Sequence, residues 1–519
     1  MNPAATTCNR GSRSLAEPLG RPLTAGLQRV SLTAFLLGAA GLSLGMWELG
    51  FSCLSAALVC SFLRWLALRG DLEAGLLLAG FLFGHMLSWG IGLIGCRYVL
   101  PWRGIPPEAF GSHTGFTALL AFIGTAGACL GGLAGIRLVR PAPRRLLTQG
   151  LATADAWPQL LVFGAASLAY WALTLKFMGL NARWTIGYNV PVDSPVYWIC
   201  GSRTPLLAFY ALLGASLKRP LSRPSNLPAG SILLVFTVLG VLTGGRQTAL
   251  EPFMFCSVGA LFSPLGAKTV IKLAPGIGAP LLVALTLLMG WARGLPAFAG
   301  GSAADKLLAL SAVLRERPPS GSDERDPLFS VFARIFEPSG QSVIDTAAET
   351  GDRVGWLHFE RLAFLYLPKF VCPDKLPLDD GWERLVESHG YESNDFSSFP
   401  ITFLADAYER FGLPGVLACH VAAGALLVFL ARLLLAIRSP QLCALVMSCA
   451  VASAVRLYPL SVLGFISVCL YGLARDAVVI STVFMLGRCA ALLLTPLARA
   501  APGRPRLDSS PRAAPWGPA

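Results

Sequence analysis

The sequence predicts an all-α polytopic membrane protein with about 12 transmembrane helices and one large, partly helical extracytoplasmic loop. Of its 519 residues, 54% are hydrophobic and only 14% are charged, whereas soluble domains carry about 25% charged residues. Apolar runs near the length that crosses a bilayer, about 20 residues, recur along most of the chain. The main exception is residues 292–412, which are polar enough to lie in water.

The apolar runs fall into two groups, about nine within residues 30–291 and the rest within residues 413–497. The run 459–474 is short and begins with Pro459. We expect it to be re-entrant or to cross half the membrane, which backbone buried in protein permits. The expected runs are 30–48, 51–68, 74–96, 115–137, 157–179, 195–217, 229–244, 247–266, 271–291, 413–436, 440–457, 459–474 and 477–497.

Basic residues set the orientation of these spans, because Lys and Arg collect in cytoplasmic connections. The large loop holds 19 of the 29 acidic residues and only 12 of the 42 basic ones, so the +13 net charge lies elsewhere. This distribution indicates membrane topology and argues against nucleic-acid binding. The connections expected in the cytoplasm are the N-terminal segment 1–29, residues 64–73, 138–156, 218–228, 266–272 and 432–438, and the Pro- and Arg-rich tail 498–519, which we expect to be disordered.

The loop 292–412 is where we expect function, since extended connections of this length are seldom mere linkers. Its residues 328–370 have helical spacing, and residues 371–400 are punctuated by Pro, Gly and Asp and predict irregular structure. Cys372 is its one cysteine, so the loop has no internal disulfide. The chain contains no CxxC or HExxH, and its five histidines are scattered, so we expect neither a metal nor a cofactor.

Two of the arginines in or beside the apolar runs are candidate functional residues, because charge there is costly. Arg246 follows two glycines in a tight outer turn and precedes a helix. An arginine beside a helix N-terminus suits a phosphate group. The alternative is an arginine that reaches to the interface from a helix end. The same alternatives apply to Arg203, near the outer end of its span.

A second group of basic residues lies in the loop, at Arg361, Lys369 and Lys375. The run Leu362–Phe370 is apolar and aromatic apart from Lys369, so we expect it to rest on the bundle or the membrane interface. A cationic cluster in an otherwise acidic loop suits a pyrophosphate. Ordinary surface ion pairs are the alternative.

Asp406 lies one turn before the next span, in an otherwise apolar helical stretch. It is either an ion-pair partner of Arg410 at i+4 or a catalytic base, because partial burial adapts a carboxylate to that task. In span 115–137, the glycines at four-residue spacing predict a helix-packing face. They are Gly127, Gly131 and Gly135.

Two segments of the loop resemble the Wzy-type polysaccharide polymerases, also called oligosaccharide repeat unit polymerases. Pro368–Pro377 resembles the family's Pro-Arg-x-x-Trp-Pro-x-Lys-Pro, with Lys369 in place of Arg, Cys372 in place of Trp and Leu376 inserted. Ala405–Gly412 resembles Gly-Glu-x-Tyr-x-x-Phe-Gly, with Asp406 in place of Glu. Gly244-Gly245-Arg246 is similar to a Gly-Ser-Arg turn. The matching motifs lie within residues 244–246 and 368–412, which make up about a tenth of the chain.

The resemblance implies a reaction between two undecaprenyl-pyrophosphate-linked oligosaccharides on the periplasmic side of a bacterial inner membrane. A sugar hydroxyl attacks the anomeric carbon of the other repeat unit, and the lipid pyrophosphate leaves without a metal. Asp406 is then the candidate base, with Tyr408 and Arg410 in the same motif. A chain-length regulator is a possible partner. The candidates for stabilising the leaving group are Arg246, Arg361, Lys369 and Lys375.

Two other functions remain open. O-antigen ligase-like enzymes have similar spans and a similar loop but transfer the glycan to another acceptor; they use a loop histidine, and His358 lies three residues before Arg361. A transporter or flippase would instead have internal repeats and charges at the membrane midplane. The two halves of this sequence show no such repeat.

Overall fold

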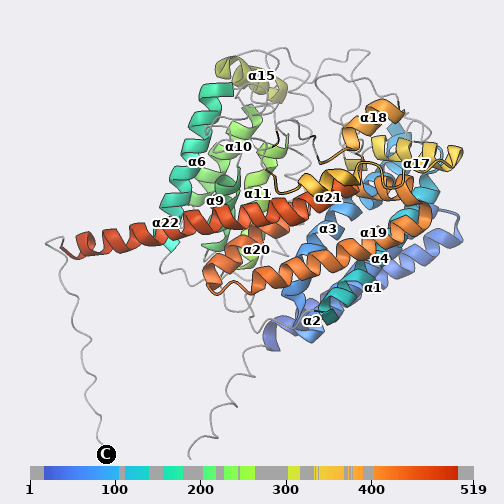
Figure 1. Ribbon diagram of the computed structural model, residues 1–519, viewed down its shortest axis with the longest axis horizontal. Coiled ribbons are helices and arrows are strands. Elements are labelled where there is room, and N and C mark those ends of the chain that lie inside the picture. Colours follow the sequence, from blue (N-terminus) through green and yellow to red (C-terminus); the bar gives the residue numbers. More distant parts are fainter. Residues whose placement is uncertain are drawn as a thin grey trace, which may run out of the picture.

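All regular structure that the computed structural model describes is helical (Figure 1). No strand occurs in the described part of the chain. These residues confirm an all-α protein. The described residues are 17–103, 111–138, 156–178, 203–217, 227–242, 246–263, 284, 302–315, 332, 335–336, 338–367, 372, 376, 378–389 and 401–500.

The helices pack into two groups, each around its own cluster of buried apolar side chains. Helix α20 (Pro440–Ala454) contacts both groups and joins them. The first group contains α1 (Glu17–Ser43), α2 (Trp47–Arg69), α3 (Leu76–Met86), α4 (Thr114–Leu138) and α19 (Phe403–Leu435). The second contains α6 (Ala156–Met178), α9 (Thr204–Ala215), α10 (Leu227–Leu242), α11 (Arg246–Leu261) and α22 (Leu473–Ala500).

Among the described residues, seven helical stretches are long and apolar enough to cross a membrane, and four apolar helices are shorter. They indicate a membrane-embedded protein. The expected span 271–291 lies almost wholly outside the described residues, as does most of the tail 498–519. The long stretches are Leu23–Ser43, Trp47–Arg69, Leu72–Trp102, Thr114–Leu138, Pro158–Lys176, Phe403–Leu435 and Val462–Leu492.

The C-terminal runs 459–474 and 477–497, which we expected to be separate segments, form one continuous helical stretch, so the expected break between them is wrong. Helix α21 (Val462–Ser467) continues through a π-helical turn, Val468–Gly472, into α22. The Ser461 hydroxyl begins the stretch by accepting a hydrogen bond from the Gly464 amide at 3.1 Å. Arg475 and Asp476 interrupt the hydropathy, but charged side chains leave the helical backbone hydrogen bonds intact.

Glycines bring α4 and α19 into close contact, which confirms the predicted packing face. A Cβ on Gly131 would overlap the carbonyl of Val421, and a Cβ on Gly127 would lie 2.9 Å from the Leu417 oxygen. Residues with higher numbers in α4 contact residues with higher numbers in α19, so the two helices are parallel. Small residues of this kind let helix backbones approach closely.

Helix α19 contains a sharp bend at Gly412, which has φ 67° and ψ −156°. That backbone region is almost exclusive to glycine. Pro414 follows and lacks the N–H that would continue the helical ladder. The bend separates a short first segment, residues 403–411, from the apolar remainder of the helix.

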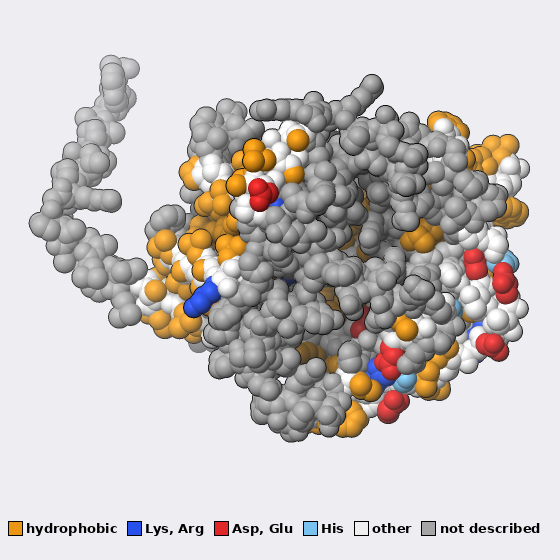
Figure 2. Space-filling view, turned by 90° about the horizontal axis from the view of Figure 1, so that it is seen from above, with side chains coloured by type: hydrophobic (Ala, Val, Ile, Leu, Met, Phe, Trp, Pro, Cys, Tyr) orange, Lys and Arg blue, Asp and Glu red, His pale blue; other side chains and the backbone are white. Residues whose placement is uncertain are grey.

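The described part of the loop 292–412 includes the α-helices α15 (Ala303–Arg315), α17 (Pro338–Thr350) and α18 (Gly381–His389), which precede α19. They lie at the top of the bundle in Figure 1. Helix α17 lies within the segment expected to be helical. Helix α18 lies within 371–400, where we expected irregular structure, so that expectation is wrong for its nine residues. Seen from the loop side, acidic, basic and histidine side chains reach the surface beside apolar ones (Figure 2).

Candidate functional site

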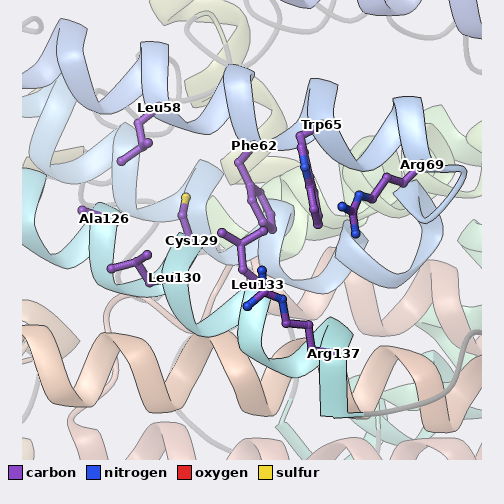
Figure 3. A pocket seen from close by; sticks show the side chains of 9 residues that line it. All are labelled: Leu58, Phe62, Trp65, Arg69, Ala126, Cys129, Leu130, Leu133 and Arg137. Carbon is purple, nitrogen blue, oxygen red and sulfur yellow. The ribbon is translucent and has the colours of Figure 1, made fainter.

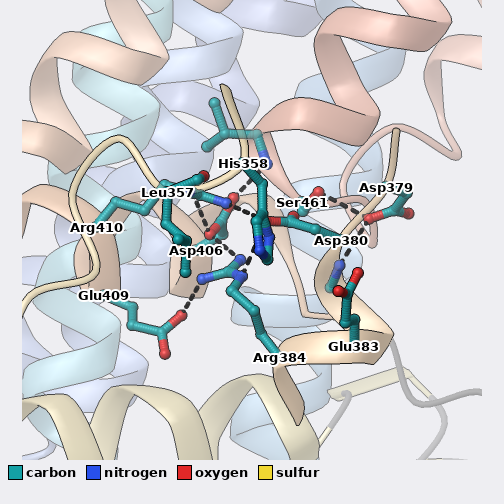
Figure 4. A network of polar contacts seen from close by, with 12 residues as sticks. Leu357, His358, Asp379, Asp380, Glu383, Arg384, Asp406, Glu409, Arg410 and Ser461 are labelled. Carbon is teal, nitrogen blue, oxygen red and sulfur yellow. Dashed lines mark hydrogen bonds and ion pairs between the residues drawn. The ribbon is translucent and has the colours of Figure 1, made fainter. Parts of the chain in front are cut away.

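A buried square of two aspartates and two arginines joins the loop to the bundle (Figure 4). Asp380 and Arg384 come from the start of α18, and Asp406 and Arg410 come from the first segment of α19. Each pair is spaced i,i+4, so both members project from the same side of their helix. We call these four residues the Asp–Arg square.

Every aspartate in the square contacts both arginines. Asp380 lies 3.2 Å from Arg384 and 2.6 Å from Arg410. Asp406 contacts Arg384 and lies 2.8 Å from Arg410. No side chain of the four is more than 1% exposed. Buried charges at this density persist only when they are paired and hydrogen-bonded.

Further bonds attach the square to its surroundings. Glu409 accepts a hydrogen bond from Arg384 and lies 2.8 Å from His389. Arg410 donates to the backbone oxygens of Gly355 and Leu357, at 3.2 and 2.7 Å. The square thereby fixes residues 355–357, α18 and the start of α19 relative to one another.

Asp406, the candidate base, has both carboxylate oxygens engaged. Oδ1 accepts hydrogen bonds from Arg384 and Arg410, and Oδ2 accepts one from the Val462 amide at the start of α21. Its side chain is fully buried. In this arrangement Asp406 positions the two arginines, and the i+4 pairing with Arg410 that the sequence allowed is present.

His358 lies at the open edge of the square. Its Nδ1 is 3.1 Å from Asp380, and its side chain is 16% exposed, whereas Asp380 is fully buried. Nε2 has no hydrogen-bond partner among the described residues. His358 also adopts a left-handed backbone conformation, φ 66°, alone among the described residues other than glycine. Such strain costs of order 1–3 kcal/mol and is frequent at functional sites.

Charge balance keeps Asp380 ionised. Burial alone would raise the pKa of Asp380, but the neighbouring Arg384 and Arg410 outweigh it and lower that pKa below its ordinary value. An ionised Asp380 holds the Nδ1–H tautomer of His358, which leaves Nε2 as a proton acceptor. The pair therefore has the geometry of an oriented general base.

Arg361 lies next to this edge and is paired with Glu383. The guanidinium donates to both carboxylate oxygens, at 2.8 and 3.0 Å. Arg361 is 7% exposed and Glu383 is 35% exposed. The hydrogen bond from Arg361 lowers the pKa of Glu383. The partly exposed Glu383 thus holds Arg361 in a bidentate pair, which is the geometry that a phosphate also offers.

Tyr408 is a packing residue in the structure. Its ring contacts Phe116 of α4 edge-on, with centroids 5.5 Å apart, and the Arg353 guanidinium lies 4.8 Å from its centroid. It is 6% exposed. These contacts hold the first segment of α19 against α4.

Arg203 belongs to a second polar cluster, in the other half of the bundle. Its guanidinium lies 3.1 Å from the Tyr170 hydroxyl and 3.5 Å from Glu251. Glu251, 1% exposed, also pairs with Arg456 at 3.1 Å. Arg203 therefore faces protein groups and not only the interface.

A short connection brings the two clusters to the same end of the bundle. Arg456 follows α20 and reaches the second cluster, and Val462 begins α21 at the Asp–Arg square. Between them, the Tyr458 oxygen accepts a hydrogen bond from the Phe403 amide at 2.9 Å. Both polar clusters therefore lie at the end of the bundle that the loop covers.

The side chains of three residues that we expected to bind phosphate lie outside the described part of the structure. Arg246 is the first residue of α11, so a helix does follow its turn, but its side chain lies outside the described part. Lys369 and Lys375 lie outside the described residues altogether. No group of three or more potential metal-binding side chains occurs within the described ranges.

The sequence argument missed Asp380 and Arg384, which complete the square. A signal was present: Asp380-x-x-Glu383 has the spacing of a helix N-terminal capping box. Asp380-x-x-x-Arg384 also repeats the spacing of Asp406-x-x-x-Arg410.

Comparison of the chain with protein-family models, with curated proteins and with solved structures gives no match.

Proposed function

We propose that this chain is an inner-membrane glycosyltransferase that joins undecaprenyl-pyrophosphate-linked oligosaccharide repeat units on the periplasmic side. The observation that carries the proposal is the meeting of His358, Arg361 and the Asp–Arg square at the loop-covered end of a membrane bundle. A reaction between two lipid-linked glycans needs such a site: near the bilayer, open to water on one side, and supplied with a base and cations.

The proposed step is a displacement at the anomeric carbon of one repeat unit. A hydroxyl oxygen of the acceptor sugar forms the new C–O bond, the bond from that carbon to the pyrophosphate oxygen breaks, and the lipid pyrophosphate leaves with the bonding electrons. The hydroxyl proton passes to Nε2 of His358, which is partly exposed and oriented by Asp380. Asp406 is too enclosed to accept it directly, so we assign Asp406 a positioning role.

Positive charge stabilises the leaving pyrophosphate. Arg361 is the described candidate, because a pyrophosphate can replace the half-exposed Glu383 as its bidentate partner. Arg246, Lys369 and Lys375 stay in the proposal on sequence grounds. Arg203 lies at the same end of the bundle, paired with Glu251.

The test is a gel of surface glycan from cells that carry a deletion of this gene and a plasmid copy. The deletion should leave glycan with one repeat unit, and the parent plasmid should restore a ladder. His358→Asn should fail to restore it, because asparagine tolerates the left-handed backbone and can donate to Asp380 but cannot accept the proton.

A matched control is His113→Asn. His113 also pairs with an aspartate, Asp345, at 3.4 Å, but it is 39% exposed and lies outside the square. It should restore the ladder. A full ladder from His358→Asn at parental expression would refute the assignment of the base, and a full ladder in the deletion strain would refute the polymerase proposal.

The second candidate function is an O-antigen ligase-like transfer to another acceptor. The His358–Asp380 pair favours this function, because O-antigen ligase-like enzymes use a loop histidine and His358 lies in the loop of this chain. Mass analysis of the product separates the two functions. A polymerase yields longer chains still attached to the lipid carrier, whereas a ligase yields glycan attached to a new acceptor.

A further inference from the structure

An apolar groove of about 440 Å³ lies between α2 and α4, at the end of the bundle away from the Asp–Arg square (Figure 3). Its volume falls within the range of about 300–1,000 Å³ typical of ligand pockets. The two helices are parallel, since Trp47 packs on Gly115 at their N-terminal ends and both end beside the groove.

Each helix presents the same ladder of positions to the groove. From the first residue, the steps are four, three and four residues, which follow one helical face, and each ladder ends in arginine. The ladder of α2 is Leu58, Phe62, Trp65 and Arg69, and that of α4 is Ala126, Leu130, Leu133 and Arg137; Cys129 of α4 also lines the groove.

The two arginines are the polar end of an otherwise apolar groove. Both are exposed, and neither has a carboxylate partner among the described residues. Arg69 lies over the Trp65 ring, 4.2 Å from its centroid. Figure 3 shows both guanidinium groups turned back toward the apolar side chains.

The position of the two arginines relative to the membrane indicates which kind of ligand the groove would bind. The connections after Arg69 and Arg137 are among the basic ones that the charge distribution assigns to the cytoplasm. The arginines then lie at the level of the headgroups of the inner leaflet, and basic pockets between helices on that side suit anionic lipid headgroups. The apolar ladder below them matches an acyl chain.

We propose that this groove binds an anionic diacyl phospholipid, with one acyl chain between α2 and α4 and the headgroup phosphate held by Arg69 and Arg137. The site lies at the opposite end from the candidate catalytic residues. It does not depend on the proposed function.

Native mass spectrometry of the full chain in detergent tests the proposal, with dioleoyl phosphatidylglycerol and dioleoyl phosphatidylethanolamine as probes. Phosphatidylglycerol should bind at least about fivefold more tightly, and Arg137→Gln should remove about fivefold of that affinity, since each basic residue near an anionic surface contributes about that factor. Ala126→Trp should fill the groove and weaken both lipids.

The matched control is Arg438→Gln, which removes an exposed arginine on the same side but outside the groove. It should leave both affinities unchanged, and size-exclusion profiles should match for all variants. Equal binding of the two lipids, an unaltered affinity in Arg137→Gln, or full displacement by inorganic phosphate would overturn the proposal. So would a dimer of the chain that Ala126→Trp dissociates, because a second copy would then be the occupant.

Discussion

Removing the Arg384 guanidinium should strongly destabilise the fold. Arg384 contacts Asp380, Asp406 and Glu409, none of which is more than 5% exposed. In Arg384→Met, Asp380 and Asp406 retain Arg410, and Glu409 retains its contact with His389. Removing one partner of a buried ion pair costs about 3–5 kcal/mol, because the uncompensated charge stays in a medium of low dielectric. We expect a loss in that range.

The free energy of unfolding can be measured by SDS titration of the detergent-solubilised chain with a thiol-reactive dye. The chain has 13 cysteines, and several are buried until the helices separate. The double variant Arg384→Met/Glu409→Gln removes one of the stranded carboxylates. It should recover part of the loss, about 1–3 kcal/mol, as expected of directly coupled residues.

Arg438→Gln is the control for loss of an arginine, and it should change the free energy by no more than about 0.5 kcal/mol. The reasoning fails if Arg384→Met is as stable as this control. It also fails if the double variant is simply the sum of the two single variants, because the network would then carry no coupling.

Three further outcomes are expected in the same unfolding assay. Gly131→Val should lower the free energy of unfolding by about 3 kcal/mol or more, because the valine side chain would meet the backbone of α19. This loss is at or above the upper end of that for ordinary overpacking. A variant as stable as the wild type would refute the close packing. Gly412→Ala should cost about 1–3 kcal/mol through backbone strain, and no cost would refute the bend. The lowered pKa values of Asp380 and Glu383 contribute stability above about pH 4, which is lost as pH falls through the folded-state values. The stability that these two carboxylates contribute should therefore be level from pH 7 to 5 and fall below about pH 4; a loss of that contribution already complete at pH 5 would contradict the assignment.

Local sequence patterns determined the helices and several contacts. Apolar runs of span length located most of the membrane helices, because a bilayer leaves the backbone few alternatives. The glycines of α4 indicated a packing face, since four-residue spacing places them on one side of the helix. The pairing of Asp406 with Arg410 followed from i,i+4 spacing within one helix.

Tertiary structure alone decided which distant residues meet. Asp380 and Arg384 lie 22 or more residues before Asp406 and Arg410. Arg384 belongs to a nine-residue helix, and Asp380 directly precedes it, inside a stretch that composition marks as irregular. No local spacing predicts a contact of that separation, because the bend at Gly412 and the docking of α18 bring the charges together. Burial then changes their roles. Asp406, which the sequence offered as a base, is enclosed by two arginines and an amide, and His358 holds the exposed edge.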